Sequence, residues 1–407
     1  LAEADVILVN TCGFIESAKT EAIENILEAC SYKQQNPDLK VIVTGCLAER
    51  YRSQIEEEIP EVDAVVGCAS NKAIDTIVER LFHGEDHLES YGAKKDFPLG
   101  GKRVIGTPAH YAYLKIAEGC NNRCHYCAIP GIRGPLHSRD MADCVAEARW
   151  LAGEGVKELI VVAQDPTAYG EDWGKPGSIC ELLDKLNKIP GLEWIRIMYA
   201  YPERITDDFI AAMKRNEKVL PYLDLPIQHC NDTILKNMNR RSTRAELLEV
   251  IGKLRREIPG ITLRTTLIAG FPGETEEQFE DLCNFVKEVQ FDRLGCFAYS
   301  AEENTVAAKM DGQIDQEVKD KRAELVMQIQ TGIMAQKQAA KVGQTVRVLC
   351  DGVDDESGLY LCRTAADAPE VDGNVCVSSE EPLYPGEFYD VLVDDSDLYD
   401  LYGTVVK

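Results

Sequence analysis

Apolar runs of strand length alternate with helical stretches along the first part of the chain, up to about residue 85. The runs are "ADVILVN", "KVIVTG" and "VDAVVG", and the stretch from Ser17 to Cys30 has helical spacing. Strands that alternate with helices in this way are typical of a parallel sheet covered by helices. The pattern predicts a flavodoxin-like α/β domain over residues 1–85. Since the chain enters almost directly on a strand and lacks an initiator Met, we expect its first βα unit to be missing.

The periodicity is lost over residues 86–106, where Gly, Lys and Pro collect, and this segment is predicted to be a linker. Beyond it, six strand-like runs recur, each followed by a helical stretch: "YAYLKIA", "ELIVVAQD", "WIRIMYAYP", "YLDLPIQH", "ITLRTTLIAGFPG" and "DRLGCFAYS". Six βα units are too few for a complete eight-stranded barrel, so residues 107–341 are predicted to form a partial TIM-like (βα)6 barrel. Reacting groups in such folds lie at the C-terminal ends of the strands.

A long polar helix, roughly Asp315 to Lys341, leads to a tail of different character. Alternating runs such as "QTVRVLC", "GLYLCRT" and "FYDVLVDD", broken by Gly, Pro and Asp, predict a small antiparallel β-barrel over residues 342–407. This tail holds 3 basic and 15 acidic residues, so it is strongly negative.

The charge of the whole chain narrows the possible partners. A formal net charge of -25 argues against free nucleic acid, because binding phosphates requires Lys and Arg to displace counterions. A basic protein fits better. No run approaches the roughly 18 consecutive apolar residues that span a bilayer. With no signal-peptide pattern either, the chain is predicted to be soluble and cytoplasmic.

The cysteines bring in candidate chemistry, since 15 of them in a large cytosolic chain are unlike a disulfide framework. The stretch "EGCNNRCHYCAIPGIRGP" places Cys120, Cys124 and Cys127 at C-x3-C-x2-C spacing directly after the first barrel strand. A structural zinc site uses four ligands. Three thiolates in a Gly/Pro-rich loop instead indicate an iron-sulfur cluster with one iron left open for a substrate or cofactor.

This loop resembles the signature of the radical S-adenosylmethionine (SAM) enzymes, C-x3-C-x-aromatic-C, with Tyr126 as the aromatic residue. The resemblance implies that the three cysteines hold a 4Fe-4S cluster whose open iron binds SAM. It also implies that an electron from the cluster splits SAM to a 5'-deoxyadenosyl radical.

A narrower resemblance covers essentially the whole chain. "VNTCGFIESA", "TGCLAER", "AIPGIRGPLHSR", "PIQHCNDTILKNMNRRST" and "LIAGFPGETEEQFEDL" are similar to the methylthiotransferases, which add an N-terminal cluster domain and a C-terminal TRAM domain to the barrel. That family holds an auxiliary 4Fe-4S cluster with three N-terminal cysteines. Cys12 and Cys46 match two of them, and the third would lie upstream of Leu1. We therefore expect this chain to hold the auxiliary cluster weakly or not at all, and to be impaired in sulfur insertion.

Within the family, the acidic tail favours the RimO-type branch. That branch methylthiolates the β-carbon of an aspartate in a very basic ribosomal protein, number twelve of the small subunit, by radical SAM chemistry. The resemblance implies docking through the acidic C-terminal domain and an electron donor of flavodoxin or ferredoxin type. The alternatives are a tRNA adenosine methylthiotransferase of the MiaB type and, in another class, a non-catalytic iron-sulfur protein. Tight, salt-sensitive tRNA binding would favour the first alternative, and a cluster that ignores SAM the second.

Weaker candidates sit at the predicted strand ends. Contacts to SAM are assigned to these residues: Tyr126, Gln164, Asp165, Gln228, Gly270 and Gly273. The two glycines, with Pro272 between them, could let the backbone approach the adenosine, although Gly-Phe-Pro-Gly is also an ordinary turn. Arg139 in "LHSR" could meet a carboxylate, but it is expected to be a solvated residue at a helix start. The remaining ten cysteines show no ligand spacing and are interpreted as small hydrophobic residues: Cys30, Cys68, Cys144, Cys180, Cys230, Cys283, Cys296, Cys350, Cys362 and Cys376.

Overall fold

The computed structural model describes residues 1, 3–94, 97–101 and 103–406. The chain forms two compact units, each built from several segments. The first comprises Leu1–Gly101, Glu118–His137 and Ser300–Lys309, and the second comprises Lys102–Ala117, Ser138–Tyr299 and Met310–Lys407. The three-cysteine loop thus belongs to the same unit as the N-terminal domain.

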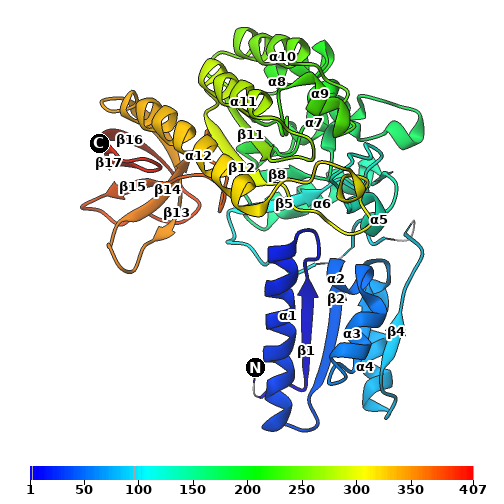
Figure 1. Ribbon diagram of the computed structural model, residues 1–407. Helices are drawn as coiled ribbons and strands as arrows, with labels where there is room; N and C mark the ends of the chain where they lie inside the picture. Colours follow the sequence, from blue (N-terminus) through cyan, green and yellow to red (C-terminus); the bar gives the residue numbers. More distant parts are fainter. Residues whose placement is uncertain (2, 95–96, 102, 407) are drawn as a thin grey trace. The chain divides into compact units, whose positions relative to one another are not determined.

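The first unit is built on a four-stranded parallel sheet in the order β1-β2-β3-β4 (Figure 1). Its strands are β1 (Val6–Thr11), β2 (Lys40–Gly45), β3 (Ala64–Gly67) and β4 (Leu88–Ser90). The helices are α1 (Glu16–Ser31), α2 (Cys46–Arg50), α3 (Arg52–Glu58) and α4 (Ile74–Phe82). The predicted parallel α/β domain is confirmed. The range expected to be a linker includes β4, whose three residues are too short a run to be recognised in the sequence.

Each face of this sheet has its own core. Ile26 of α1 and Ile55 of α3 pack with Val43 on one face, whereas Ile77 of α4 packs with Val66 on the other. Apolar side chains that alternate between the two faces of a strand are buried on both sides, as parallel sheets require. This explains why the strands read as nearly continuous apolar runs.

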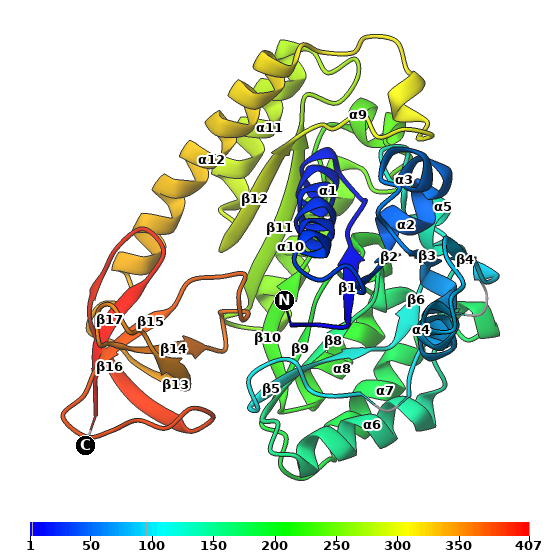
Figure 2. The same cartoon turned by 90° about the horizontal axis from the view of Figure 1, so that it is seen from below.

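The second unit contains a six-stranded parallel sheet in the order β12-β11-β10-β9-β8-β5 (Figure 2). The strands are β5 (Tyr111–Lys115), β8 (Glu158–Val162), β9 (Trp194–Ile197), β10 (Val219–Asp224), β11 (Thr262–Ala269) and β12 (Arg293–Ala298). The helices are α6 (Met141–Gly153), α7 (Ser178–Leu186), α8 (Asp207–Arg215), α9 (Asp232–Asn237), α10 (Arg244–Glu257), α11 (Glu276–Val289) and α12 (Gln316–Ala339). All six strands expected from the sequence are present, and the sheet is open, as six βα units predict.

The parallel register decides which side chains of this sheet share a face. Tyr113 is paired with Ile160, Ile160 with Arg196, and Asp224 with Arg264. Residues opposite one another in a parallel pair point the same way. We call the face that carries these five residues the inner face. The other face is packed against the surrounding helices.

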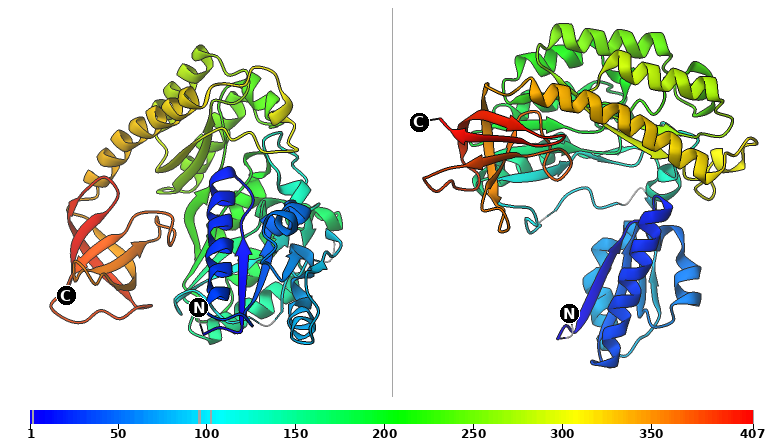
Figure 3. Two further views of the ribbon diagram at one scale, coloured as in Figure 1. Left: turned by 60° about the horizontal axis from the view of Figure 1, so that its bottom comes forward. Right: turned by 60° about the vertical axis from the view of Figure 1, so that its left-hand side comes forward.

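The tail forms a closed five-stranded barrel in the order β13-β14-β15-β17-β16 (Figure 3). Its strands are β13 (Thr345–Val353), β14 (Tyr360–Thr364), β15 (Val375–Ser378), β16 (Phe388–Ser396) and β17 (Leu401–Val405). The predicted small barrel is confirmed with one difference, because β15 and β17 pair in parallel. The intervening β16 supplies the crossover that a parallel pair needs.

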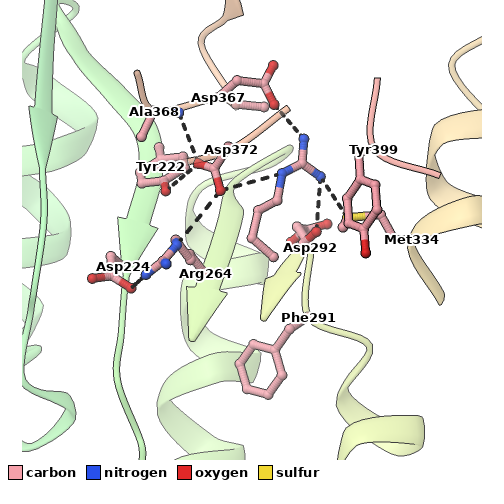
Figure 4. A network of polar contacts seen from close by, with 12 residues as sticks. Tyr222, Asp224, Arg264, Phe291, Asp292, Met334, Asp367, Ala368, Asp372 and Tyr399 are labelled. Carbon is pink, nitrogen blue, oxygen red and sulfur yellow. Dashed lines mark hydrogen bonds and ion pairs between the residues drawn. The ribbon is translucent and has the colours of Figure 1, made fainter. Parts of the chain in front are cut away.

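This C-terminal barrel covers the half of the inner face that lies toward the strand N-termini. One buried cluster joins both parts, with Tyr111, Ile160, Trp194 and Tyr222 from the sheet and Leu349, Ala368 and Phe388 from the C-terminal part. A layer of buried ion pairs adjoins it. Arg264 bonds Asp224 at 3.0 Å and lies 3.7 Å from Asp372, and Tyr222 donates to Asp372 at 2.7 Å (Figure 4). The cluster also reaches the C-terminal ends of two strands, through Val162 of β8 and Met198 after β9.

Candidate functional site

The three-cysteine loop runs between β6 (Ala117–Glu118) and α5 (Ile129–Arg133). Cys120, Cys124 and Cys127 are all partly buried, and the backbone N–H of Cys127 donates to the carbonyl of Cys124 at 3.0 Å. Gly119 has φ of 74° and lies so close to Pro135 that a Cβ would stand 2.1 Å from the Pro135 carbonyl oxygen. Only glycine permits this tight entry into the loop.

The donor chemistry of this loop fits an iron-sulfur cluster. Burial, together with the nearby Cys124 and Cys120, raises the pKa of the Cys127 thiol to about 12, so the three sulfurs are close enough to influence one another. Soft thiolates suit iron, and binding it removes their mutual repulsion. Among the described residues, no group of three or more His, Cys, Asp or Glu side chains has the arrangement of a ready metal cage. The fit therefore rests on the donor set.

Cys12 and Cys46 leave neighbouring strands of the N-terminal sheet at the same edge, because the β1–β2 register pairs Thr11 with Gly45. Cys12 is exposed, whereas Cys46 is buried at the start of α2. Each of the two cysteines thus directly follows a strand of this sheet.

Cys46 has an unusual environment for a buried thiol. A hydrogen bond shared with Cys68 lowers the pKa of Cys46 to about 6 despite the opposing effect of burial, and Arg133 adds a favourable positive charge. The Arg133 Nη2 donates to Cys46 Sγ at 3.1 Å, and its Nη1 lies 3.2 Å from Glu118. Thiolates are stabilised by such cationic neighbours.

The sequence did not reveal these partners of Cys46. Cys68 was interpreted as a small hydrophobic residue, and it is indeed buried, but it also touches Cys46 in a cluster with Phe97 and Ile132. Arg133 stands in the family-like segment "AIPGIRGPLHSR", but the sequence assigned it no function. Its distance of 87 residues from Cys46 in the sequence leaves no local signal for the contact.

The segment 300–309 connects the N-terminal helices with the cysteine loop. Glu302 is buried and pairs with Arg50 at 2.8 Å and with Lys19 at 3.5 Å. Burial opposes ionisation of Glu302, but Ser300, Arg50 and Lys19 outweigh it, so its pKa is lowered. The N–H of Ala307 donates to the carbonyl of His125 inside the cysteine loop at 2.9 Å. The first unit is therefore held together by contacts between distant segments.

The second unit brings two of the predicted SAM contacts onto adjacent strand ends. Gln228 follows β10 with φ of 69°, and Gly270 follows β11 with φ of 75°. The Gln228 N–H donates to Thr266 and its carbonyl accepts from Ile268, which joins the two strands. Gly273, with φ of 81°, donates to the carbonyl of Gly312 at 2.9 Å.

Asp165 and Arg139 are engaged in structural contacts. Asp165 is buried, pairs with Arg204 at 3.0 Å and accepts from the Thr167 hydroxyl at 2.5 Å. The expectation of a solvated Arg139 is wrong: its side chain is buried and pairs with Asp143 at 2.8 Å and with Glu147. Acidic residues one and two turns into α6 provide the partners that permit this burial. Gln164 and Tyr126 are partly buried, at the end of β8 and within the cysteine loop.

Glu274 is a buried carboxylate that the sequence analysis missed. Both of its oxygens accept from the Gly270 N–H at 3.1 Å, and Arg322 of α12 donates to one of them at 2.8 Å. His229 Nε2 lies 3.3 Å from Glu274, and its Nδ1 accepts from the Asn231 N–H at 3.0 Å, so Nε2 carries the proton. One carboxylate thus fixes the chain after both β10 and β11. Its place in "PGETEE" among other acidic residues gave no signal.

Gly270→Ala is expected to destabilise the protein and to weaken SAM binding. A Cβ at this position would stand 2.3 Å from Cγ of Lys319, whose buried side chain is fixed by a bond to the Tyr299 carbonyl. The strain and the left-handed backbone together should lower the free energy of unfolding by about 2–4 kcal/mol. Gly260 has the same φ of 75° with open space around its Cβ position, so Gly260→Ala isolates the backbone cost. Equal losses in urea unfolding for both variants would contradict the steric argument.

Three sequence profiles match this chain. Residues 1–67 match the uncharacterized protein family UPF0004, residues 114–286 the radical SAM superfamily, and residues 342–406 the TRAM domain. Among the described residues, no helix is both long and apolar enough to cross a membrane.

Two curated relatives are similar over nearly the whole chain. The ribosomal protein uS12 methylthiotransferase RimO of Acetivibrio thermocellus is 47% identical over 412 residues, which cover 100% of this chain and 91% of that protein. The protein of the same name from Lachnoclostridium phytofermentans is 48% identical over 407 residues, which cover 99% and 92%. Among solved structures, the radical SAM methyltransferase TsrM of Kitasatospora setae has a TM-score of 0.56 at 14% identity, with 72% of this chain and 61% of that chain covered. That likeness shows the fold.

Proposed function

Because this chain belongs to the RimO family of radical SAM methylthiotransferases, we propose that it methylthiolates the β-carbon of an aspartate in ribosomal protein uS12. The observation that carries the proposal is the three-thiol loop, Cys120, Cys124 and Cys127, within a chain that matches this family from end to end. When bound, the 4Fe-4S cluster supplies the electron that splits SAM into methionine and a 5'-deoxyadenosyl radical. An unactivated β-carbon has no acidic hydrogen, so a side-chain base could not replace that chemistry.

The residues of the chain hold and orient these groups. The three cysteines bind the cluster, and Tyr126 lies beside the last of them. At the barrel strand ends, the Gln228 side-chain amide and the close approach that Gly270 permits are the proposed contacts to SAM, and Gln164, Asp165 and Gly273 are the further candidates. Glu274 positions the Gly270 N–H and, through His229, the chain after β10. A buried carboxylate with three partners keeps this geometry fixed before the substrate binds.

For the auxiliary cluster we propose Cys12 and Cys46 as ligands. Their common edge supports the proposal, and Arg133 beside Cys46 would stabilise the thiolate that a metal requires. The sulfur to be transferred would be carried at this second cluster, as the resemblance implies. Cys68 lies in hydrogen-bond contact with Cys46 and is the nearest thiol that could substitute for a ligand.

The acidic TRAM domain is the proposed docking surface for the basic ribosomal protein, in the cytoplasm where ribosomes assemble. Acidic residues are exposed on the β13–β14 turn, at Asp355 and Glu356, and on β16, at Asp394 and Asp395. Opposite charges accelerate association and exclude wrong partners. The electron donor is proposed to be of flavodoxin or ferredoxin type.

Reversing the charge at Asp355 and Glu356 is expected to slow association with uS12. The double lysine variant should weaken the complex by about 3- to 10-fold at low salt, and the difference should shrink as salt screens the charges. The matched control reverses Glu277 and Glu280, which are exposed on α11 and give the same change in net charge. Association rates measured over a salt series distinguish the two. Equal slowing in both variants would show that only net charge matters.

The proposed function is tested by following the hydrogen that is abstracted from the aspartate β-carbon, rather than the sulfur that is added to it. Anaerobically reconstituted protein, SAM, a reductant and uS12 deuterated at the aspartate β-carbon are incubated together. Deuterium in the 5'-deoxyadenosine shows abstraction at that carbon, whether or not the auxiliary cluster is complete. Mass spectrometry of uS12 then reports the methylthio group. Deuterium-free 5'-deoxyadenosine, or transfer from a tRNA adenosine substrate instead, would overturn the proposal.

A further inference from the structure

Two large aromatic side chains are exposed at the ends of barrel strands β9 and β12, which β10 and β11 separate in the sheet. Tyr199 lies two residues after β9 and is 45% exposed, although Met198 and Ala200 on either side are buried. Phe297 near the end of β12 is 57% exposed, and its register partner on β11 is Ile268. The cluster with the C-terminal barrel includes the adjacent Met198 but neither of these two rings. Nothing in the packing of the second unit accounts for the exposure of these rings.

Tyr199 is also held in a conformation that a tyrosine rarely adopts. Its φ is 65°, in the left-handed region, where a bulky residue is an outlier. The backbone is fixed there by the buried Asp224, whose Oδ2 accepts from the Tyr199 N–H at 3.1 Å. The carbonyl of the same Asp224 accepts from the Ala200 N–H at 2.8 Å. A strained residue that its surroundings hold firmly in place is a mark of a functional position.

The electrostatic neighbours of the ring locate it over the inner face. Burial raises the pKa of Tyr199, the carboxylate of Asp224 raises it further, and Arg264 opposes the shift. Tyr199 in turn contributes to the raised pKa of Tyr113. Tyr113, Asp224 and Arg264 are all inner-face residues. Within the described part of the chain, the Tyr199 hydroxyl makes no hydrogen bond, so it is available to a ligand.

We propose that the exposed ring of Tyr199, at the C-terminal end of β9, contacts the polypeptide substrate and sets its affinity. The assignment rests on the proposed function. Exposed aromatic rings with a polar tip supply large contact area at a low entropic cost, which is why tyrosine dominates the energetics of protein recognition. The exposed ring suits a basic peptide, because the aliphatic stems of Lys and Arg pack on an aromatic face and their charges are attracted to it. Phe297 provides a second apolar surface for the same segment.

The test removes the ring without adding backbone strain. Tyr199→Gly is compared with wild type for binding of a synthetic peptide that covers the target aspartate segment of uS12, by calorimetry on reconstituted, SAM-loaded protein. The peptide Kd should rise at least about 10-fold. SAM affinity and thermal stability should be unchanged or, for stability, increased, because glycine accepts this φ. Tyr199→Phe, which keeps the ring, should show only a small part of the loss.

Gln290→Gly is the matched control. Gln290 ends α11 with φ of 51°, so glycine there relieves the same kind of strain away from the inner face. It should leave peptide binding unchanged. If wild type binds the peptide and Tyr199→Gly binds it equally well, the role of Tyr199 is wrong while the proposed function stands. An equal loss of SAM affinity would make Tyr199 a cofactor contact and also overturn the proposal. If wild type itself does not bind the peptide, the proposed function fails and this assignment fails with it.

Discussion

Replacing Cys124 by serine is expected to abolish SAM cleavage. A 4Fe-4S cluster that is held by three thiolates loses a third of its protein ligands in this variant, and a serine hydroxyl is a poor donor to iron at neutral pH. Iron content of the reconstituted protein should fall well below that of wild type. The SAM-dependent change of the reduced EPR spectrum should disappear, and 5'-deoxyadenosine should fall below detection.

Cys180→Ser provides the control for the loss of a thiol. Cys180 is partly buried on α7 in the second unit, and no ligand role is proposed for it. This variant should retain the iron content, the spectrum and the cleavage rate of wild type. If Cys124→Ser keeps its cluster and still cleaves SAM, the ligand assignment of the loop is wrong.

Replacing Glu158 by alanine strongly destabilises the second unit. Glu158 is fully buried and bridges two arginines, Arg196 at 2.7 Å and Arg363 of the C-terminal barrel at 2.6 Å. Removing it leaves two buried cations without their shared partner. Breaking a buried ion pair from one side costs about 3–5 kcal/mol when the remaining charge is left uncompensated. This applies to Arg196, whereas Arg363 keeps its ion pair with Asp351 at 2.6 Å. Urea unfolding should show this loss of free energy.

The comparison with milder variants identifies the cause of the loss. Glu158→Gln keeps the size and one acceptor, so it should lose less stability than alanine. The exposed pair between Lys214 and Glu257, at 2.8 Å on the helix surface, supplies the opposite case. Glu257→Ala should change the unfolding transition little, because water replaces the partner of an exposed charge. If Glu158→Ala were as mild as Glu257→Ala, the bridge would not hold the C-terminal barrel to the sheet.

The sequence was most informative about features that depend on residues close together in the chain. Strands such as Lys40–Gly45 and Val219–Asp224 are short apolar runs between turns, and both were located from that pattern. The spacing of Cys120, Cys124 and Cys127 carried the resemblance to the family, because these three cysteines lie within one short loop. Alternating runs in the tail predicted the small barrel, and its acidic composition favoured a basic partner. The strand and cysteine signals each lie within a few consecutive residues, and the charge is a simple sum over the sequence.

The features that the sequence did not reveal all depend on contacts between segments that are distant in the chain. The short strand β4 has only three residues, Leu88–Ser90, and its pairing with β3 gives it its structure. Arg139 was expected in solvent, since nothing in its immediate sequence shows that α6 folds its acidic residues over it. Glu274 is one of several acidic residues in its segment, and only the packing of α12 and the neighbouring strand gives it buried partners.

The six barrel strands, the small C-terminal barrel, the three-cysteine loop and the excess of negative charge could all be recognised from the sequence. Periodicity, spacing and composition specify these directly, because they depend on neighbours along the chain. Only the tertiary structure decided that Cys46 meets Arg133 and Cys68, that one carboxylate fixes two strand ends, and that Tyr199 is strained and exposed. Burial, charge pairing and strain arise when segments distant in the sequence come together, so no local pattern can encode them.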